Sequence, residues 1–142
     1  MLKTTSQLLS HHRLIEEKQA KHYTNLAKKY PEFEEVFNRL GKENIRHIEV
    51  AQRAYREGVT DAFEVGFLST PLDPVNYLIK EPKNDVKESV KVLIENEKTI
   101  IGFCMNAASN SSILLPDLSE TFERLVKRKN RNIEKLRNIE KD

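Results

Sequence analysis

Residues 84–108 read NDVKESVKVLIENEKTIIGFCMNAA, and this stretch decides how the rest of the chain is interpreted. It contains no Pro, and its apolar residues recur at spacings of three and four, which is the period of an α-helix. The apolar face of this helix is interrupted at Glu97, between Leu93 and Ile100. Because an amphipathic helix must bury its apolar face against other elements, the stretch predicts a helical bundle.

Three other segments show the same helical period. Residues 4–29 lack Gly and Pro, and a second segment lies between Pro31 and Gly58. Acidic residues directly after Pro31 favour a helix start, since the N-terminal end of a helix dipole is positive. A fourth segment opens at Pro116. We therefore expect one domain spanning residues 1–142, with helices at about 4–29, 32–57, 85–108 and 116–140.

A longer connection separates the second predicted helix from the third. Residues 59–83 contain one Gly and three Pro, which favours irregular backbone. We expect an ordered crossover with one or two short helical turns, packed against the body through Phe63, Val65, Phe67, Leu68 and Tyr77. Two helical hairpins joined in this way predict an all-α fold, an up-down four-helix bundle.

The composition excludes several classes of protein. The chain has 142 residues, of which 38% are hydrophobic and 32% charged, with a net charge of +2. No apolar run approaches the ~20 residues of a bilayer-spanning helix, so we expect no membrane partner. The single cysteine, Cys104, cannot form a disulfide within the chain, which favours a reducing, cytoplasmic location. We expect this thiol to fill space in the core.

Polar residues interrupt the inward face of all four predicted helices at about the same height. In chain order they are Glu16, Asn44, His47, Glu97, Lys129 and Asn132. Burying a charged group costs several kcal/mol unless the group is paired or binds a metal. The sequence therefore predicts a polar cluster in the middle of the bundle. A shift of the register by one residue would replace these positions by neighbours such as Glu17 and Glu43.

This pattern resembles the rubrerythrin-like branch of the ferritin superfamily. Di-metal carboxylate bundles take one Glu from each of two helices and a Glu-x-x-His pair from each of the other two. The resemblance lies in EEKQAKHY at 16–23, VFNRL at 36–40, the segment 97–104 and TFERL at 121–125. It implies a ferritin-like fold and a homodimer. In complete members of the family it implies iron-dependent peroxide reduction or ferrous oxidation.

Only half of the family's ligand positions carry a ligand residue here. The matching residues are Glu16, His47 and Glu97, and the departures are Asn44, Lys129 and Asn132. The ammonium group of Lys129 can pair with carboxylates in place of a metal. We therefore expect a degenerate, metal-free centre without di-iron chemistry.

Two alternatives remain open for the centre. One keeps a single iron, manganese or zinc ion, bound by the three matching residues together with Asn44 or His12. The other is an active iron oxidoreductase of the peroxide or ferroxidase type. Tyr23, seven residues after Glu16, is then the candidate catalytic residue as a redox-active phenol. We expect His11 and His12 to lie in solvent.

The last predicted helix is strongly basic. From Arg124 to Arg137 it carries seven Lys and Arg residues and one acid, Glu134. A basic helix face can bind phosphates, so a nucleic-acid or acidic-partner module is the rival hypothesis. We favour a solvated face balanced by the acidic residues of the second helix, because base-reading motifs and stacking aromatics are missing. On this basis no nucleic-acid partner is expected.

Overall fold

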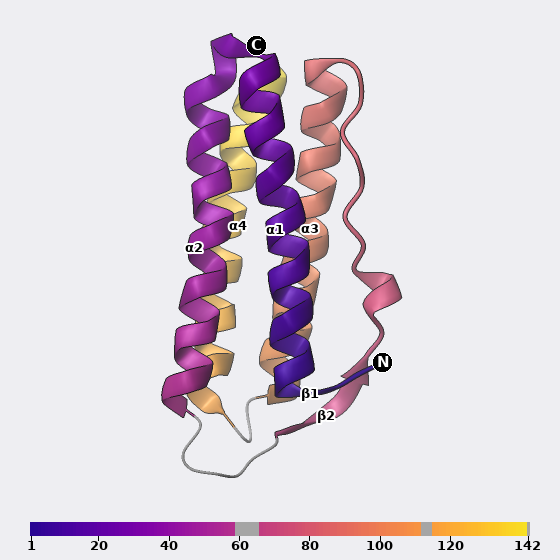
Figure 1. Cartoon of the computed structure of the whole chain (residues 1–142), viewed down its shortest axis with the longest axis vertical. Helices are drawn as coiled ribbons and strands as arrows, with labels where there is room; N and C mark the ends of the chain where they lie inside the picture. The colour runs from indigo at the N-terminus through magenta and orange to yellow at the C-terminus, as the bar shows by residue number, and fades with distance from the viewer. Residues whose placement is uncertain (59–65, 112–114, 142) are drawn as a thin grey trace.

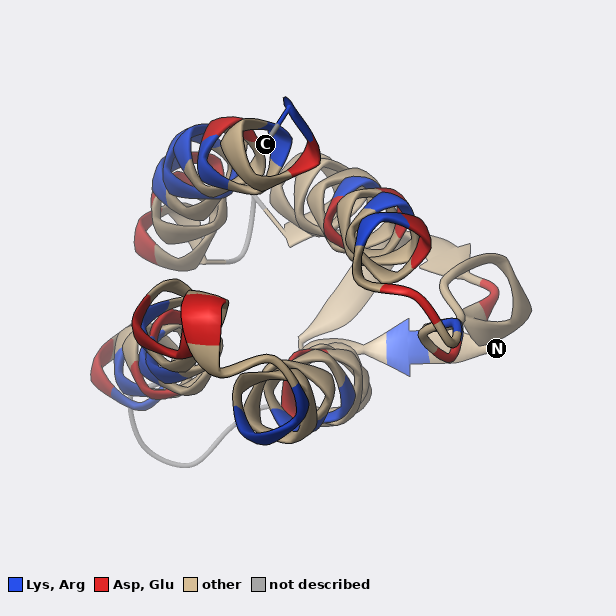
Figure 2. Ribbon diagram, turned by 90° about the horizontal axis from the view of Figure 1, so that it is seen from above, with Lys and Arg blue, Asp and Glu red and all other residues tan. Residues whose placement is uncertain are grey.

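A computed structural model describes residues 1–58, 66–111 and 115–141 of the chain. Four long helices form a bundle, and their bounds are α1 (Thr5–Lys29), α2 (Glu34–Gly58), α3 (Val86–Ser111) and α4 (Pro116–Lys141). α1 and α4 run in one direction and α2 and α3 in the other, because the α2–α3 connection returns along the side of the bundle (Figure 1). α1 packs on α2 and α3 packs on α4, while α2 with α4 and α1 with α3 close the bundle (Figure 2). The predicted all-α bundle of four helices is confirmed, but its predicted up-down order is wrong, because the α2–α3 connection spans the length of the bundle and makes α2 and α3 parallel.

The helix ends follow local chemistry. Thr4 caps α1, because its side chain accepts a hydrogen bond from the Gln7 backbone N–H while the Gln7 side chain accepts one from the Thr4 N–H. A 3₁₀ turn, η1 (Pro31–Phe33), precedes α2, so α2 begins at Glu34, two residues later than predicted. α3 continues to Ser111, three residues beyond its predicted end.

The connection between α2 and α3 contains a strand that was not predicted. Strand β1 (Leu2–Thr4) pairs antiparallel with β2 (Phe67–Leu72), and Leu2 lies opposite Leu72. A 3₁₀ turn, η2 (Pro74–Asn76), follows. We predicted only short helical turns in this connection. The pairing was missed because β1 lies at the N-terminal end of the chain, far in sequence from β2, and no local pattern can reveal such a contact.

The crossover packs against the bundle through some of its predicted residues. Leu68 is buried, and the Tyr77 ring lies 5.1 Å from the Phe103 ring, centroid to centroid, in an edge-to-face arrangement. The Asn106 amide also donates to the Tyr77 hydroxyl at 2.6 Å. Phe67, in contrast, is largely exposed. Phe63 and Val65, which were expected to pack here, lie outside the described residues.

The buried apolar residues form two clusters, one in each half of the bundle. The ribbon-side cluster lies near β1 and β2 and includes Leu8, Ile100, Phe103, Leu118 and Phe122. The turn-side cluster lies near the α1–α2 turn and includes Tyr23, Phe37, Leu40, Leu93 and Leu136. Within the described part of the chain, no helix is both long enough and apolar enough to cross a membrane.

Candidate functional site

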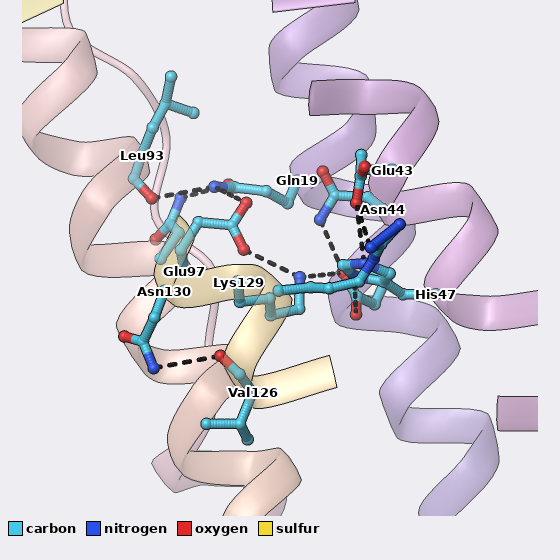
Figure 3. Close-up of polar contacts among 12 residues, drawn as sticks. Gln19, Glu43, Asn44, His47, Leu93, Glu97, Val126, Lys129 and Asn130 are labelled. Carbon is cyan, nitrogen blue, oxygen red and sulfur yellow. Dashed lines mark hydrogen bonds and ion pairs between the residues drawn. The ribbon is translucent and has the colours of Figure 1, made fainter. Parts of the chain in front are cut away.

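A layer of buried polar residues lies between the two apolar clusters. All four helices contribute to it, and its charged and amide members are at most 1% exposed: Glu16, Asn44, His47, Glu97 and Lys129. Figure 3 shows the side chain of Lys129 reaching between Glu97 on one side and the α2 residues Asn44 and His47 on the other. The structure thus brings together five of the six residues that the sequence placed at the centre.

The register predicted for the inward faces is confirmed by burial. The alternatives for a register shifted by one residue were Glu17 and Glu43. The Glu17 side chain is 48% exposed and that of Glu43 is 23% exposed, whereas Glu16 is fully buried. The predicted three- and four-residue spacing therefore identifies the side chains that point inward.

Lys129 occupies the middle of the layer. Its Nζ lies 2.7 Å from Glu16 Oε1 and 2.9 Å from Glu97 Oε1, so it joins α4 to α1 and α3. Burial alone would lower the pKa of this ammonium group, but the two carboxylates outweigh burial and raise its pKa above the ordinary lysine value. Lys129 therefore stays protonated at neutral pH.

The two oxygens of Glu16 face different partners. Oε1 accepts from Lys129 and from Asn44 Nδ2, the latter at 2.7 Å. Oε2 lies 2.9 Å from His12 Nε2. Burial would raise the pKa of this carboxyl, yet the Lys129 charge, the hydrogen bond from His12 and the nearby His47 ring outweigh burial and hold the pKa well below its usual range. Glu16 is a carboxylate with both oxygens occupied.

Glu97 is satisfied in the same way from the α1 side. Its Oε1 accepts from Lys129, while its Oε2 accepts from the Tyr23 hydroxyl at 2.7 Å and from Gln19 Nε2 at 3.3 Å. Burial, and after it the Glu97 charge, raises the pKa of Tyr23 well above the ordinary tyrosine value. The phenol therefore acts as a fixed hydrogen-bond donor and keeps its proton.

Two members of the network were not singled out from the sequence. Gln19 Nε2 donates to the Leu93 carbonyl, and its Oε1 accepts from Asn96 Nδ2 at 3.0 Å. Asn96 also exchanges two hydrogen bonds with the Lys80 backbone, which ties the crossover to the polar layer. The spacing of Gln19 from Glu16, three residues on one helix face, was a usable signal. Asn96 gave no such signal, because its partners lie on another helix and in the crossover.

The expectation that His11 and His12 lie in solvent is wrong. Both are buried: His11 lies against the crossover, whereas His12 faces into the bundle beside Phe103 and Phe122. His11 Nε2 lies 3.2 Å from the Tyr77 carbonyl, and burial lowers the His11 pKa. The His12 ring lies parallel to Phe103. Because a carboxylate only accepts, His12 Nε2 carries the hydrogen in its contact with Glu16.

His47 is the least satisfied member of the layer. Its Nδ1 lies 3.7 Å from Glu16 Oε2 and its Nε2 lies 3.2 Å from Glu43 Oε1, but neither contact has hydrogen-bond geometry. Asn44 Oδ1 likewise has no hydrogen-bond partner. Unsatisfied buried polar atoms are rare in proteins. They are concentrated here on the α1–α2 side of the layer.

Two predicted residues stay outside the network. Asn132 is buried on α4 but makes no hydrogen bond to the layer among the described residues. Cys104 is a buried free thiol, and burial raises its pKa above the ordinary cysteine value. The expectation that Cys104 fills space in the core is confirmed by this burial, since a thiol that keeps its proton is a poor nucleophile.

A pair of metal ions does not fit this donor set. Every carboxylate oxygen of Glu16 and Glu97 already has a partner, and the Lys129 ammonium lies between the two carboxylates. The parts of the chain that the structure describes hold no group of three or more His, Cys, Asp or Glu side chains arranged to bind a metal. The layer is built as an ion and hydrogen-bond network.

No protein-family model, curated protein or solved structure matches this chain. Its function is therefore inferred from the chemistry of the polar layer and from the charges on the outer faces of the helices. The chemistry of the polar layer is used to ask whether the protein is an oxidoreductase. The charges on the outer faces are used to ask what the protein binds.

Proposed function

We propose that this chain is a ferritin-like bundle of the rubrerythrin type whose di-metal centre has been replaced by a lysine-centred ion network. The observation that carries the proposal is the position of Lys129 Nζ, within 2.9 Å of both Glu16 and Glu97. Its ammonium group supplies at the centre the positive charge that metal ions supply in a complete site. The protein then has no di-iron turnover and acts through its surface.

The protonation states of the layer agree with a structural role. Tyr23 and Cys104 are the residues whose phenol and thiol would serve redox chemistry, and burial raises the pKa of both above the ordinary value. Both groups therefore keep their protons at neutral pH. Each charged group in the layer instead contacts a partner on another helix. This arrangement favours one relative register of the four helices.

Metal analysis tests this proposal directly. The protein is incubated anaerobically with ferrous iron, desalted and analysed for metal. We expect wild type to retain no stoichiometric iron, and Lys129→Glu, which adds a carboxylate to two existing ones, to gain iron. Arg128→Glu makes the same charge change on the exposed neighbouring position and should gain none. About two irons per wild-type chain would overturn the proposal.

A single metal ion on the α1–α2 side is the second candidate. The unsatisfied nitrogens of His47 favour it, because His12 and His47 both approach Glu16 Oε2, the oxygen that Lys129 does not contact. Two imidazoles and one carboxylate are a donor set that iron and zinc accept. The imidazoles would have to turn from their present orientation, since they are not arranged around one point.

The two candidates differ in what histidine variants do. If one ion binds, wild type retains about one iron, manganese or zinc per chain, and both His12→Ala and His47→Ala lose it. If the network is metal-free, all three proteins retain none. His22→Ala is the matched control, because His22 lies beside Glu81 of the crossover and outside the layer.

A homodimer is also part of the proposal. Large apolar side chains of the crossover are exposed, namely Phe67, Val75 and Leu78 at 66%, 68% and 60%. Burying such side chains between two copies is favourable. Light scattering should give twice the chain mass for wild type and one chain mass for Leu78→Lys. A wild-type monomer at high protein concentration would contradict this part of the proposal.

A further inference from the structure

α4 carries a row of basic residues, and blue marks the Lys and Arg positions along its ribbon in Figure 2. Arg124, Arg128, Arg131 and Lys135 follow one another at spacings of four, three and four residues, so they share one helix face. The three arginines are exposed and Lys135 is half-buried. At 1.5 Å per residue the row is about 16 Å long.

The row lies next to α2. Arg128 lies 3.9 Å from Glu43 of α2, so this part of the row lies where α4 packs on α2. We call Arg124, Arg128, Arg131 and Lys135 the basic face.

Few acidic residues pair directly with the basic face. The contact between Arg128 and Glu43 is the one ion pair that joins α2 and α4 among the described residues. In the described ranges, the other three members of the basic face have no carboxylate within 4.0 Å: Arg124, Arg131 and Lys135.

We propose that the basic face binds the phosphate backbone of duplex nucleic acid without reading its sequence. This inference goes beyond the proposed function and uses no residue of the polar layer. Duplex DNA carries one negative charge per ~1.7 Å, so a row of about 16 Å lies opposite about ten phosphate charges. Three of the four members of the face are arginines, whose planar guanidinium groups bind phosphate through two hydrogen bonds.

The remaining chemistry of the face favours a duplex over other polyanions. None of its members is aromatic, so there is no platform on which unpaired bases could stack. The exposed large apolar residues of the described chain include none from α4, so α4 offers no side chain for insertion into a membrane. A partner recognised by charge alone, through regularly spaced phosphates, matches what the face presents.

Binding of a fluorescently labelled 20-base-pair DNA duplex, followed by anisotropy at several salt concentrations, tests the proposal. The test variant is Arg124→Gln/Arg128→Gln/Arg131→Gln. The control is Lys18→Gln/Lys87→Gln/Lys98→Gln, which removes the same charge from exposed positions on α1 and α3. Circular dichroism checks that both variants fold. A second duplex of scrambled sequence tests whether binding depends on sequence.

For wild type we expect log Kobs to fall with log[salt] with a slope near −4, or about 0.9 for each phosphate contact. Removing three contacts should reduce the slope by about 2.7 and weaken binding more than tenfold at low salt. The control variant and the scrambled duplex should behave like wild type. Equal losses in both variants, or tighter binding to polyglutamate or to anionic lipid vesicles than to the duplex, would overturn the proposal. Metal analysis is independent of every one of these outcomes.

Discussion

The polar layer and the two apolar clusters hold the same four helices together by different physics. In the turn-side cluster, Phe37, Leu93 and Leu136 are fully buried and contribute through area removed from water, which has no direction. In the polar layer, Lys129 is equally buried but depends on two carboxylates at 2.7 and 2.9 Å. The clusters therefore tolerate substitutions of similar volume, whereas the layer requires each charge to keep its partner.

Among the changes that test this comparison, removal of the central charge should cause the largest loss in the free energy of unfolding. Lys129→Met keeps most of the side-chain volume but leaves two buried carboxylates without their cation. Breaking a buried ion pair in this way costs about 3–5 kcal/mol, measured as a fall in the free energy of urea unfolding. Lys127→Met makes the same change at an exposed position of α4 and should cost less than about 0.5 kcal/mol. A loss below about 1 kcal/mol for Lys129→Met would show that the layer is not a coupled network.

Removal of all three buried charges should lower the free energy of unfolding less than removal of the Lys129 charge alone. In Glu16→Gln/Glu97→Gln/Lys129→Met no buried charge remains, and the glutamine oxygens still accept from Asn44 and Tyr23. We expect this triple variant to unfold with about 2 kcal/mol more free energy than Lys129→Met alone. If the triple variant is instead the less stable of the two, the layer acts through its individual hydrogen bonds rather than through charge balance.

Loss of one hydrogen bond to a buried carboxylate should have a smaller effect. Tyr23→Phe removes the donor at 2.7 Å from Glu97 Oε2, while Gln19 still donates to the same oxygen. We expect a loss of about 1.5 kcal/mol in chemical denaturation. Tyr30→Phe removes a hydroxyl whose bond to the Asn84 carbonyl is exposed, and it should change stability by less than about 0.5 kcal/mol.

The smallest expected effect is the change in unfolding free energy with pH near neutrality. The folded state lowers the pKa of Glu16, so the Glu16 contribution is complete above its unfolded pKa of about 4.3 and is lost as pH falls through the folded pKa. The folded state raises the pKa of Lys129. The Lys129 contribution to stability is therefore complete below its unfolded pKa of about 10.4 and is lost as pH rises through the folded pKa. Both contributions are therefore constant between about pH 5 and 9.

The difference in unfolding free energy between wild type and Glu16→Gln isolates this pH dependence. That difference should stay constant between about pH 5 and 9 and shrink in acid, because the protonated Glu16 and the glutamine are both neutral. A steady decline across the neutral range would mean that another group in the layer titrates there. The stability of each protein at each pH comes from its urea midpoint.

The α-helical period was enough to predict the inward residues but not their partners. Glu16, Glu97 and Lys129 were placed at one height because the apolar spacing of each helix can be followed along the chain. The spacing could not show that Asn96 holds the Lys80 backbone or that His11 lies against the Tyr77 carbonyl of the crossover. Both contacts join a helix to the irregular crossover, and no periodic pattern encodes them.

The sequence by itself determined four amphipathic helices, their approximate ends and the polar interruption in each inward face, because helix periodicity and proline are local properties of the chain. Only the tertiary structure decided that β1 pairs with β2, that Lys129 reaches both carboxylates, and that the basic face of α4 keeps most of its charge unpaired. Those outcomes depend on distances between side chains of different helices. Distances of that kind are set by how the whole bundle packs, and not by the order of residues within any one helix.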